Sequence, residues 1–145
     1  MSINLVDVED IKQITFNGVA SKGGVLQTTM IQSVNNFHFQ PEFAILRNIA
    51  FNTTTATTGV YLIWSNLIND YMTSVTGQLG SGANHSPQTV MKIQRPIDQL
   101  IFQLYQLNND GTITAPTSLP NDWLFSLTFD FVRLKKYNSF TSITK

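Results

Sequence analysis

The 145-residue chain contains no cysteine and few charged residues. Without cysteine it has no disulfide, no thiolate metal site and no cysteine nucleophile. Charged residues make up 12% of the sequence, and nine Lys and Arg balance nine Asp and Glu. A neutral chain lacks the broad electrostatic surface that attracts nucleic acid or an anionic membrane. Nucleic acid is therefore only weakly supported as a partner.

The sequence also has no long apolar run. None approaches the ~20 residues of a membrane-spanning helix, so we expect no membrane span. The acidic N-terminus shows no basic segment followed by an apolar one, so we expect no signal peptide and synthesis in the cytoplasm. A chain of this length is sized for one domain, which buries roughly 70% of the surface that the unfolded chain exposes.

Histidine is scarce, and no catalytic constellation is present. His38 lies between two Phe residues and His85 lies in a Gly-rich segment, neither at a metal-ligand spacing. No nucleophile-elbow pattern accompanies the serines. Asn109-Asp110-Gly111 lacks the alternating oxygen ligands of a calcium loop, and we assign it to a turn. We predict no enzyme, no cofactor, and no catalytic or metal-binding residue.

What the sequence does have is alternation of aromatic and polar residues. In residues 122–134 large apolar side chains stand at every other position, with Ser126, Thr128 and Asp130 among the residues between them. Successive side chains of a strand point to opposite faces, so the aromatic set lies on one face, in a core. Residues 98–107 repeat the pattern. The predicted core residues are Phe102, Leu104, Trp123, Phe125, Leu127, Phe129 and Phe131.

Eight segments have the composition of strands, without a convincing long helix or an internal repeat. They are residues 11–16, 27–39, 42–52, 59–66, 67–76, 88–94, 98–107 and 122–134. The segment 67–76 also fits a turn of helix that enters a strand. Eight strands favour an all-β fold, and two four-stranded antiparallel sheets packed as a jelly-roll sandwich account for the count. We predict an N-terminal arm (1–10), a single jelly-roll domain (11–137) and a C-terminal tail (138–145).

Some strands are apolar on both faces. Residues 60–64 (VYLIW) are apolar at consecutive positions, which indicates that both faces of this strand are covered. The cover is either a loop of the same chain or a neighbouring subunit. The basic cluster near the C-terminus is either the soluble end of an edge strand or a contact with an acidic neighbour. The candidate interface residues are Tyr61, Ile63, Trp64, Arg133, Lys135 and Lys136.

These segments together resemble a known family. The segments that carry the resemblance are Phe43–Phe51, Val60–Leu67, Pro96–Leu104, Asn109–Gly111 and Trp123–Phe129. It is similar to single jelly-roll penton and minor capsid proteins of icosahedral double-stranded DNA viruses, the lineage of virophages, Polinton-like viruses, giant viruses and adenovirus. Those proteins often contain a strand that ends in Ile-x-Ser-Asx-Leu, which here is Ile63–Leu67.

The resemblance implies a structural protein of the virion, assembled in the infected host cell. It implies no catalytic residue. The implied partners are further copies of the chain, as a homo-oligomer such as a pentamer, and neighbouring capsid proteins.

A carbohydrate- or receptor-binding β-sandwich module is the alternative hypothesis, with a glycan as the partner. Four aromatic residues, if exposed, can stack on a sugar ring, and packing in a core or an interface is the competing role for each. They are Tyr61, Trp64, Tyr71 and Trp123.

Overall fold

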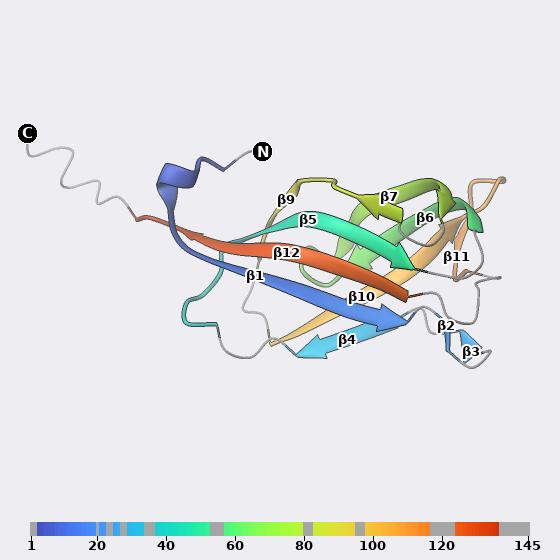
Figure 1. The fold of residues 1–145 in the computed structure, drawn as a ribbon, viewed down its shortest axis with the longest axis horizontal. Coiled ribbons are helices and arrows are strands. Elements are labelled where there is room, and N and C mark those ends of the chain that lie inside the picture. Colours follow the sequence, from blue (N-terminus) through green and yellow to red (C-terminus); the bar gives the residue numbers. More distant parts are fainter. Residues whose placement is uncertain are drawn as a thin grey trace, which may run out of the picture.

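The structure is a computed structural model. It describes residues 3–19, 21–22, 25–26, 29–33, 37–52, 57–79, 83–94, 98–116 and 124–136. In these residues a single turn of 3-10 helix, η1 (Leu5–Asp7), is the only helix, and it precedes the first strand (Figure 1). The strands are β1 (Val8–Val19), β2 (Ser21–Lys22), β3 (Val25–Leu26), β4 (Thr29–Ser33), β5 (Phe43–Asn52), β6 (Thr57–Ser65), β7 (Asp70–Leu79), β8 (Ala83–His85), β9 (Thr89–Lys92), β10 (Gln99–Leu107), β11 (Ile113–Thr114) and β12 (Leu124–Leu134).

The strands form two antiparallel sheets that face each other. The β12 sheet has the order β1-β12-β5, with both β8 and β9 paired to β5. The β10 sheet has the order β4-β10-β6-β7, and the two-residue β11 pairs with the end of β10. A short hairpin of β2 and β3 stands apart from both sheets.

The connectivity is that of a jelly roll. β8 and β9 pair with successive stretches of β5, so they are two halves of one interrupted strand. The main strands within the described ranges then number eight, four in each sheet. The β12 sheet holds the first, eighth, third and sixth in chain order, and the β10 sheet holds the second, seventh, fourth and fifth. The predicted all-β, eight-stranded jelly-roll sandwich is confirmed.

The core lies between the sheets and is largely aromatic. Phe129 of β12 stacks on Phe102 of β10, with ring centroids 5.6 Å apart and an interplanar angle of 18°. Phe16 of β1 lies 5.5 Å from Phe102 and 5.9 Å from Phe129. Trp123 lies outside the described residues. The other predicted core residues are all buried, namely Phe102, Leu104, Phe125, Leu127, Phe129 and Phe131.

The N-terminal segment joins the β12 sheet earlier than expected. β1 begins at Val8, so this strand takes in three residues that the sequence analysis assigned to an arm. Two contacts with β12 and its end hold the segment. The Arg133 guanidinium pairs with the Asp10 carboxylate, and Lys135 N donates to Asp7 O at 2.8 Å. The tail predicted at 138–145 lies outside the described residues.

The turn between β6 and β7 explains the Ile-x-Ser-Asx-Leu segment. Ser65 Oγ accepts a hydrogen bond from Leu67 N at 3.1 Å. Asn66 Nδ2 donates to Gln99 O at 2.8 Å, and Asn66 Oδ1 accepts from Ile101 N at 3.0 Å. The Asn66 amide therefore pairs with the β10 backbone where β6 has ended. The chain then turns through residues 66–69 directly into β7, without the turn of helix considered for this region.

Candidate interaction surface

Strand β6 is apolar on both faces, as the sequence predicts. Its inward side chains are fully buried in the core, Tyr61 at 2% exposure and Ile63 at 0%. Alternation then turns Val60, Leu62 and Trp64 outward, where each is half-buried. Tyr61 and Ile63 are therefore core residues rather than interface residues, which corrects the sequence-based expectation. Trp64 does lie on the outer surface of the β10 sheet.

Neighbouring strands extend this outer apolar surface. Leu62 is paired with Tyr105 of β10, and Trp64 is paired with Tyr71 of β7. The Tyr71 and Tyr105 rings meet edge to face, with centroids 5.8 Å apart. The Tyr105 hydroxyl donates to Gln103 Oε1 at 2.7 Å, so it is satisfied within the same surface.

We call this outer surface of the β10 sheet the aromatic face. Three of the six exposed large hydrophobic side chains in the described ranges lie on it, namely Tyr71 (38%), Leu107 (36%) and Ile113 (41%). The outward-facing positions of β6 and β10 carry no charged side chain among the described residues, and Asp70 and Asp98 stand only at strand ends. Its members are Val60, Leu62, Trp64, Tyr71, Ile101, Tyr105, Leu107 and Ile113.

The outer surface of the β12 sheet is different, because polar groups there partner one another. Asp130, only 7% exposed, accepts hydrogen bonds from Arg47 Nε at 2.7 Å and Gln13 Nε2 at 3.0 Å. Thr15 and Thr128 hydroxyls lie 3.0 Å apart on adjacent strands. This surface therefore contains a charged pair, which the aromatic face lacks.

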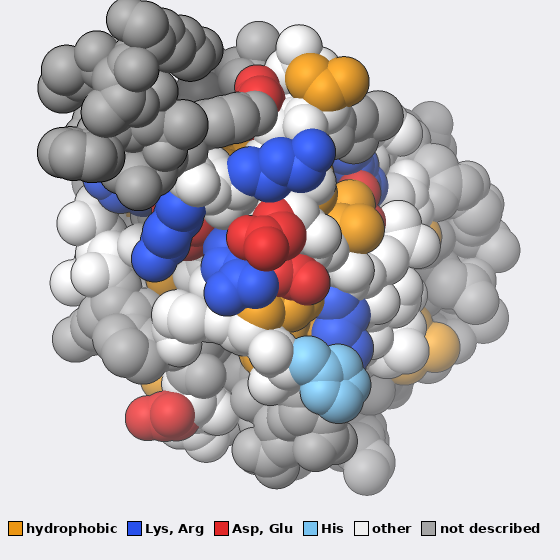
Figure 2. Space-filling model, turned by 90° about the vertical axis from the view of Figure 1, so that its left-hand side faces the viewer, with side chains coloured by type: hydrophobic (Ala, Val, Ile, Leu, Met, Phe, Trp, Pro, Cys, Tyr) orange, Lys and Arg blue, Asp and Glu red, His pale blue; other side chains and the backbone are white. Residues whose placement is uncertain are grey.

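The basic cluster at the end of β12 is engaged within the chain. Arg133 Nε donates to Asp10 Oδ2 at 2.8 Å, Glu9 lies 3.8 Å away, and the guanidinium stands over the Phe39 ring. Lys135 and Lys136 are exposed. Figure 2 shows that blue and red groups intermingle at this end of the molecule. The end therefore presents both signs of charge, and Arg133 is already paired inside the subunit.

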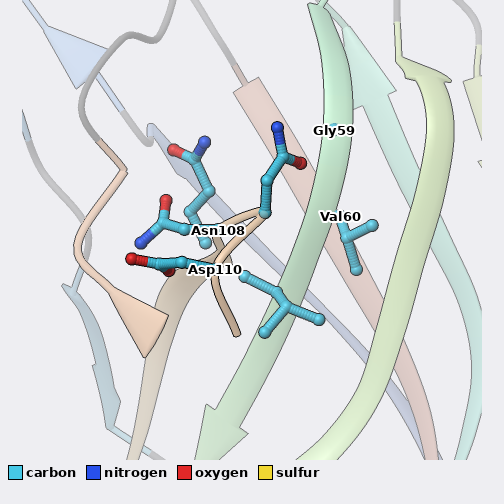
Figure 3. A pocket seen from close by; sticks show the side chains of 7 residues that line it. Gly59, Val60, Asn108 and Asp110 are labelled. Atoms are coloured by element: carbon cyan, nitrogen blue, oxygen red, sulfur yellow. The ribbon is translucent and has the colours of Figure 1, made fainter. Parts of the chain in front are cut away.

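A depression of about 570 Å³ lies where β6 begins and β10 ends. It is lined by Gly59, Val60 and residues 106–110 (Figure 3). The polar side chains of its lining form hydrogen bonds within the adjoining turn, residues 108–114. Asn108 Nδ2 donates to two threonine hydroxyls, each at 3.0 Å. The Asp110 carboxylate accepts from the Thr112 hydroxyl and backbone N–H, and these bonds lower the pKa of Asp110. The predicted turn is confirmed, since Gly111 N donates to Asn108 O at 2.9 Å.

No metal cluster is found in the described ranges, where no three His, Asp or Glu side chains gather. His38 is exposed and His85 is half-buried in β8. The described residues likewise contain no helix long and apolar enough to cross a membrane.

Comparisons with known proteins add little. No protein-family model matches the chain, and no curated protein matches it. The Drosophila NLP core, described for pentamer formation and histone binding, is 6% identical, with 86% of this chain and 98% of that chain covered at a TM-score of 0.43. A carbohydrate-binding module, CBM36 in complex with calcium and xylotriose, is 13% identical, with 90% and 100% covered at a TM-score of 0.28. Scores this low carry no argument about function.

The structure brings together some predicted residues and adds others. Trp64 and Tyr71 share the aromatic face, whereas Tyr61 points into the core. Leu62 and Tyr105 belong to the face but were not predicted. The period-2 pattern contains the signal for both, because Leu62 lies between the inward Tyr61 and Ile63, and Tyr105 follows the inward Leu104.

Proposed function

We propose that the chain is a structural assembly protein, a jelly-roll subunit of a viral capsid that works through contacts between subunits and not through catalysis. The aromatic face is the observation that carries this proposal. The sandwich has a complete core between its sheets, and yet one sheet also carries a group of apolar side chains on its outer surface. On this proposal the protein resides in the virion, beside further copies and neighbouring capsid proteins.

Burial energetics favour a covered face. Contiguous apolar patches larger than a few hundred Å² are rare on soluble monomers and mark interaction sites. Each Å² of apolar surface removed from water stabilises an assembly by roughly 25 cal/mol before association costs are subtracted. Trp64, Tyr71 and Tyr105 offer large contact areas with few rotatable bonds, which is typical of protein interfaces.

Two further features support a capsid subunit in particular. The jelly-roll connectivity is the fold that the resemblance to penton and minor capsid proteins implies. The Ile63–Leu67 segment, which carries part of that resemblance, ties β6 to β10 through Asn66. Both features describe the fold of a single subunit, so assembly of several subunits needs a test of its own.

The test is the mass of the purified protein in solution, measured by size exclusion with light scattering over a range of concentrations. We expect a multiple of the 16.3 kDa chain mass. Leu107→Arg should shift the mass toward the monomer. The matched control is Leu124→Arg, since Leu124 is a similarly exposed Leu on the other sheet. A monomer at every concentration contradicts the proposal.

A glycan-binding module is the second candidate, favoured by the clustering of Trp64, Tyr71 and Tyr105 on one surface. Aromatic rings exposed on a sheet stack on sugar rings. Binding on a glycan array that Trp64→Ala abolishes, from a protein that stays monomeric and folded, supports this candidate. A blank array removes it.

A further inference from the structure

We infer that the aromatic face is self-complementary, and that it packs against the same face of a second copy of this chain across a two-fold axis. The inference rests on the proposed function, since it names the contact through which the subunit assembles. It goes further by fixing which surface is used and which surface it meets. A head-to-tail contact uses two different surfaces, whereas this one uses a single surface twice.

The charge distribution of the face favours contact with its own copy. When a surface meets its own copy, every charged residue near the axis approaches a like charge, which is destabilising. The outward-facing positions of β6 and β10 carry no charged residue in the described ranges. Asp70 and Asp98 stand at the edge of the face, where β7 and β10 begin. The centre of the face can therefore meet itself without repulsion.

The other sheet is a poor surface for this face to cover. Its outer surface holds the Arg47–Asp130 ion pair, and the Arg47 side chain is 34% exposed. Laying an apolar face over that guanidinium strips its water, and the resulting desolvation offsets the gain from burial. As far as the described side chains go, the aromatic face can be covered by an apolar partner without that cost.

The area is sufficient for a specific contact. β6, β7 and β10 have nine or ten residues and are ~30 Å long at 3.3 Å per residue, whereas β4 has five residues and is ~16 Å long. Each strand takes up ~4.8 Å of the width of the sheet. The face then measures roughly 520 Å², and two copies bury roughly 1,000 Å². Specific interfaces begin at about 1,000 Å², so a pair of aromatic faces reaches the lower end of the range.

The absence of cysteine permits a clean cross-linking test. Leu62 lies near the centre of the face, flanked by Val60 and Trp64 along β6 and by Tyr105 and Ser74 on its neighbours. A two-fold axis through the centre places it near its own counterpart. Stacked sheets lie ~10 Å apart and a disulfide needs Cα atoms within about 7 Å, so a short bismaleimide is the suitable reagent.

The experiment compares Leu62→Cys with Thr15→Cys, an exposed position on the outer surface of the other sheet. We expect the reagent to convert most of the Leu62→Cys protein into a covalent dimer and to leave Thr15→Cys monomeric. Gln103→Cys is a second variant on the same face, and it removes no apolar group. It should cross-link like Leu62→Cys, even if the loss of the Leu62 side chain weakens association.

The outcomes separate this inference from the proposed function. An oligomer by light scattering without cross-linking at Leu62→Cys or Gln103→Cys overturns the inference and leaves assembly standing. Cross-links that form only in a mixture of Leu62→Cys and Thr15→Cys copies also overturn it, because they show a head-to-tail contact. A strictly monomeric wild-type protein removes both.

Discussion

Arg47 occupies the extra position of a β-bulge in β5, and its Nε lies 2.7 Å from Oδ2 of Asp130 on β12. The register places Asn48 opposite Thr128 and Leu46 opposite Phe129, so Arg47 itself has no partner in the ladder. Gln88 Nε2 donates a hydrogen bond to Arg47 O at 3.2 Å. The bulge turns Arg47 to the outer surface of the β12 sheet, where it can reach a nearly buried carboxylate.

Replacing Arg47 by Met should destabilise the fold by about 1–3 kcal/mol, because it leaves the Asp130 carboxylate nearly buried without its cation. Urea unfolding measures the change. The double variant with Asp130→Asn should recover part of the loss, since a neutral amide needs no counter-ion. Strictly additive effects in this double-mutant cycle contradict the coupling.

Truncating Phe129 to Ala should lower the free energy of unfolding by about 3–5 kcal/mol. Phe129 is fully buried and its ring contacts the rings of Phe16, Phe102 and Phe131. Thr128→Ala is the matched control, because Thr128 is adjacent on β12 but faces outward. Thermal or urea denaturation should show a loss of less than about 1 kcal/mol for the control. Equal losses mean that the inward register of β12 is misassigned.

Asn66 should be sensitive to substitution in a graded way. Asn66→Ala removes both side-chain hydrogen bonds to β10 and should cost about 1–2 kcal/mol. Asn66→Asp can still accept from Ile101 N but cannot donate to Gln99 O, so it should retain part of the stability. Asn69→Gly in the same turn should be neutral or slightly stabilising, because Asn69 has φ 57°. Denaturant titration of the three variants checks this order.

Burial of Tyr61 raises its pKa above the ordinary value of about 10. The folded state then holds the phenolic proton more tightly than the unfolded state. The contribution of the protonated Tyr61 to the free energy of unfolding is fully present below about pH 10. It is lost as pH rises further, because Tyr61 ionises first in the unfolded chain. Tyr61→Phe should show a shallower decline of stability above pH 10 in parallel denaturation series. An identical pH slope in both proteins contradicts this assignment.

Much of the fold could be predicted from the sequence because it rests on alternation. Large apolar residues at every other position predict β12 within residues 122–134 and β10 within residues 98–107. The Arg47–Asp130 pair could not be predicted, since the bulge that turns Arg47 outward depends on the register between β5 and β12. Asp130 looked like an ordinary polar-face residue, and its burial follows from contacts 83 and 117 residues away in sequence.

The candidate surface was predicted only in part, for a related reason. A strand that is apolar on both faces does not reveal which side chains point inward, so Tyr61, Ile63 and Trp64 were grouped as interface residues. The core selects Tyr61 and Ile63, and leaves Trp64 outside. The intramolecular pairing of Arg133 with Asp10 brings together residues 123 positions apart, which no local pattern encodes.

The central claim is that the aromatic face is covered by another molecule. Sedimentation equilibrium of wild type, Leu62→Arg and Leu124→Arg at matched concentrations tests it most directly. We predict a wild-type mass of at least twice 16.3 kDa, retained by Leu124→Arg and reduced to the monomer mass in a folded Leu62→Arg protein. A wild-type mass of 16.3 kDa throughout, or an unchanged oligomer in Leu62→Arg, contradicts the account.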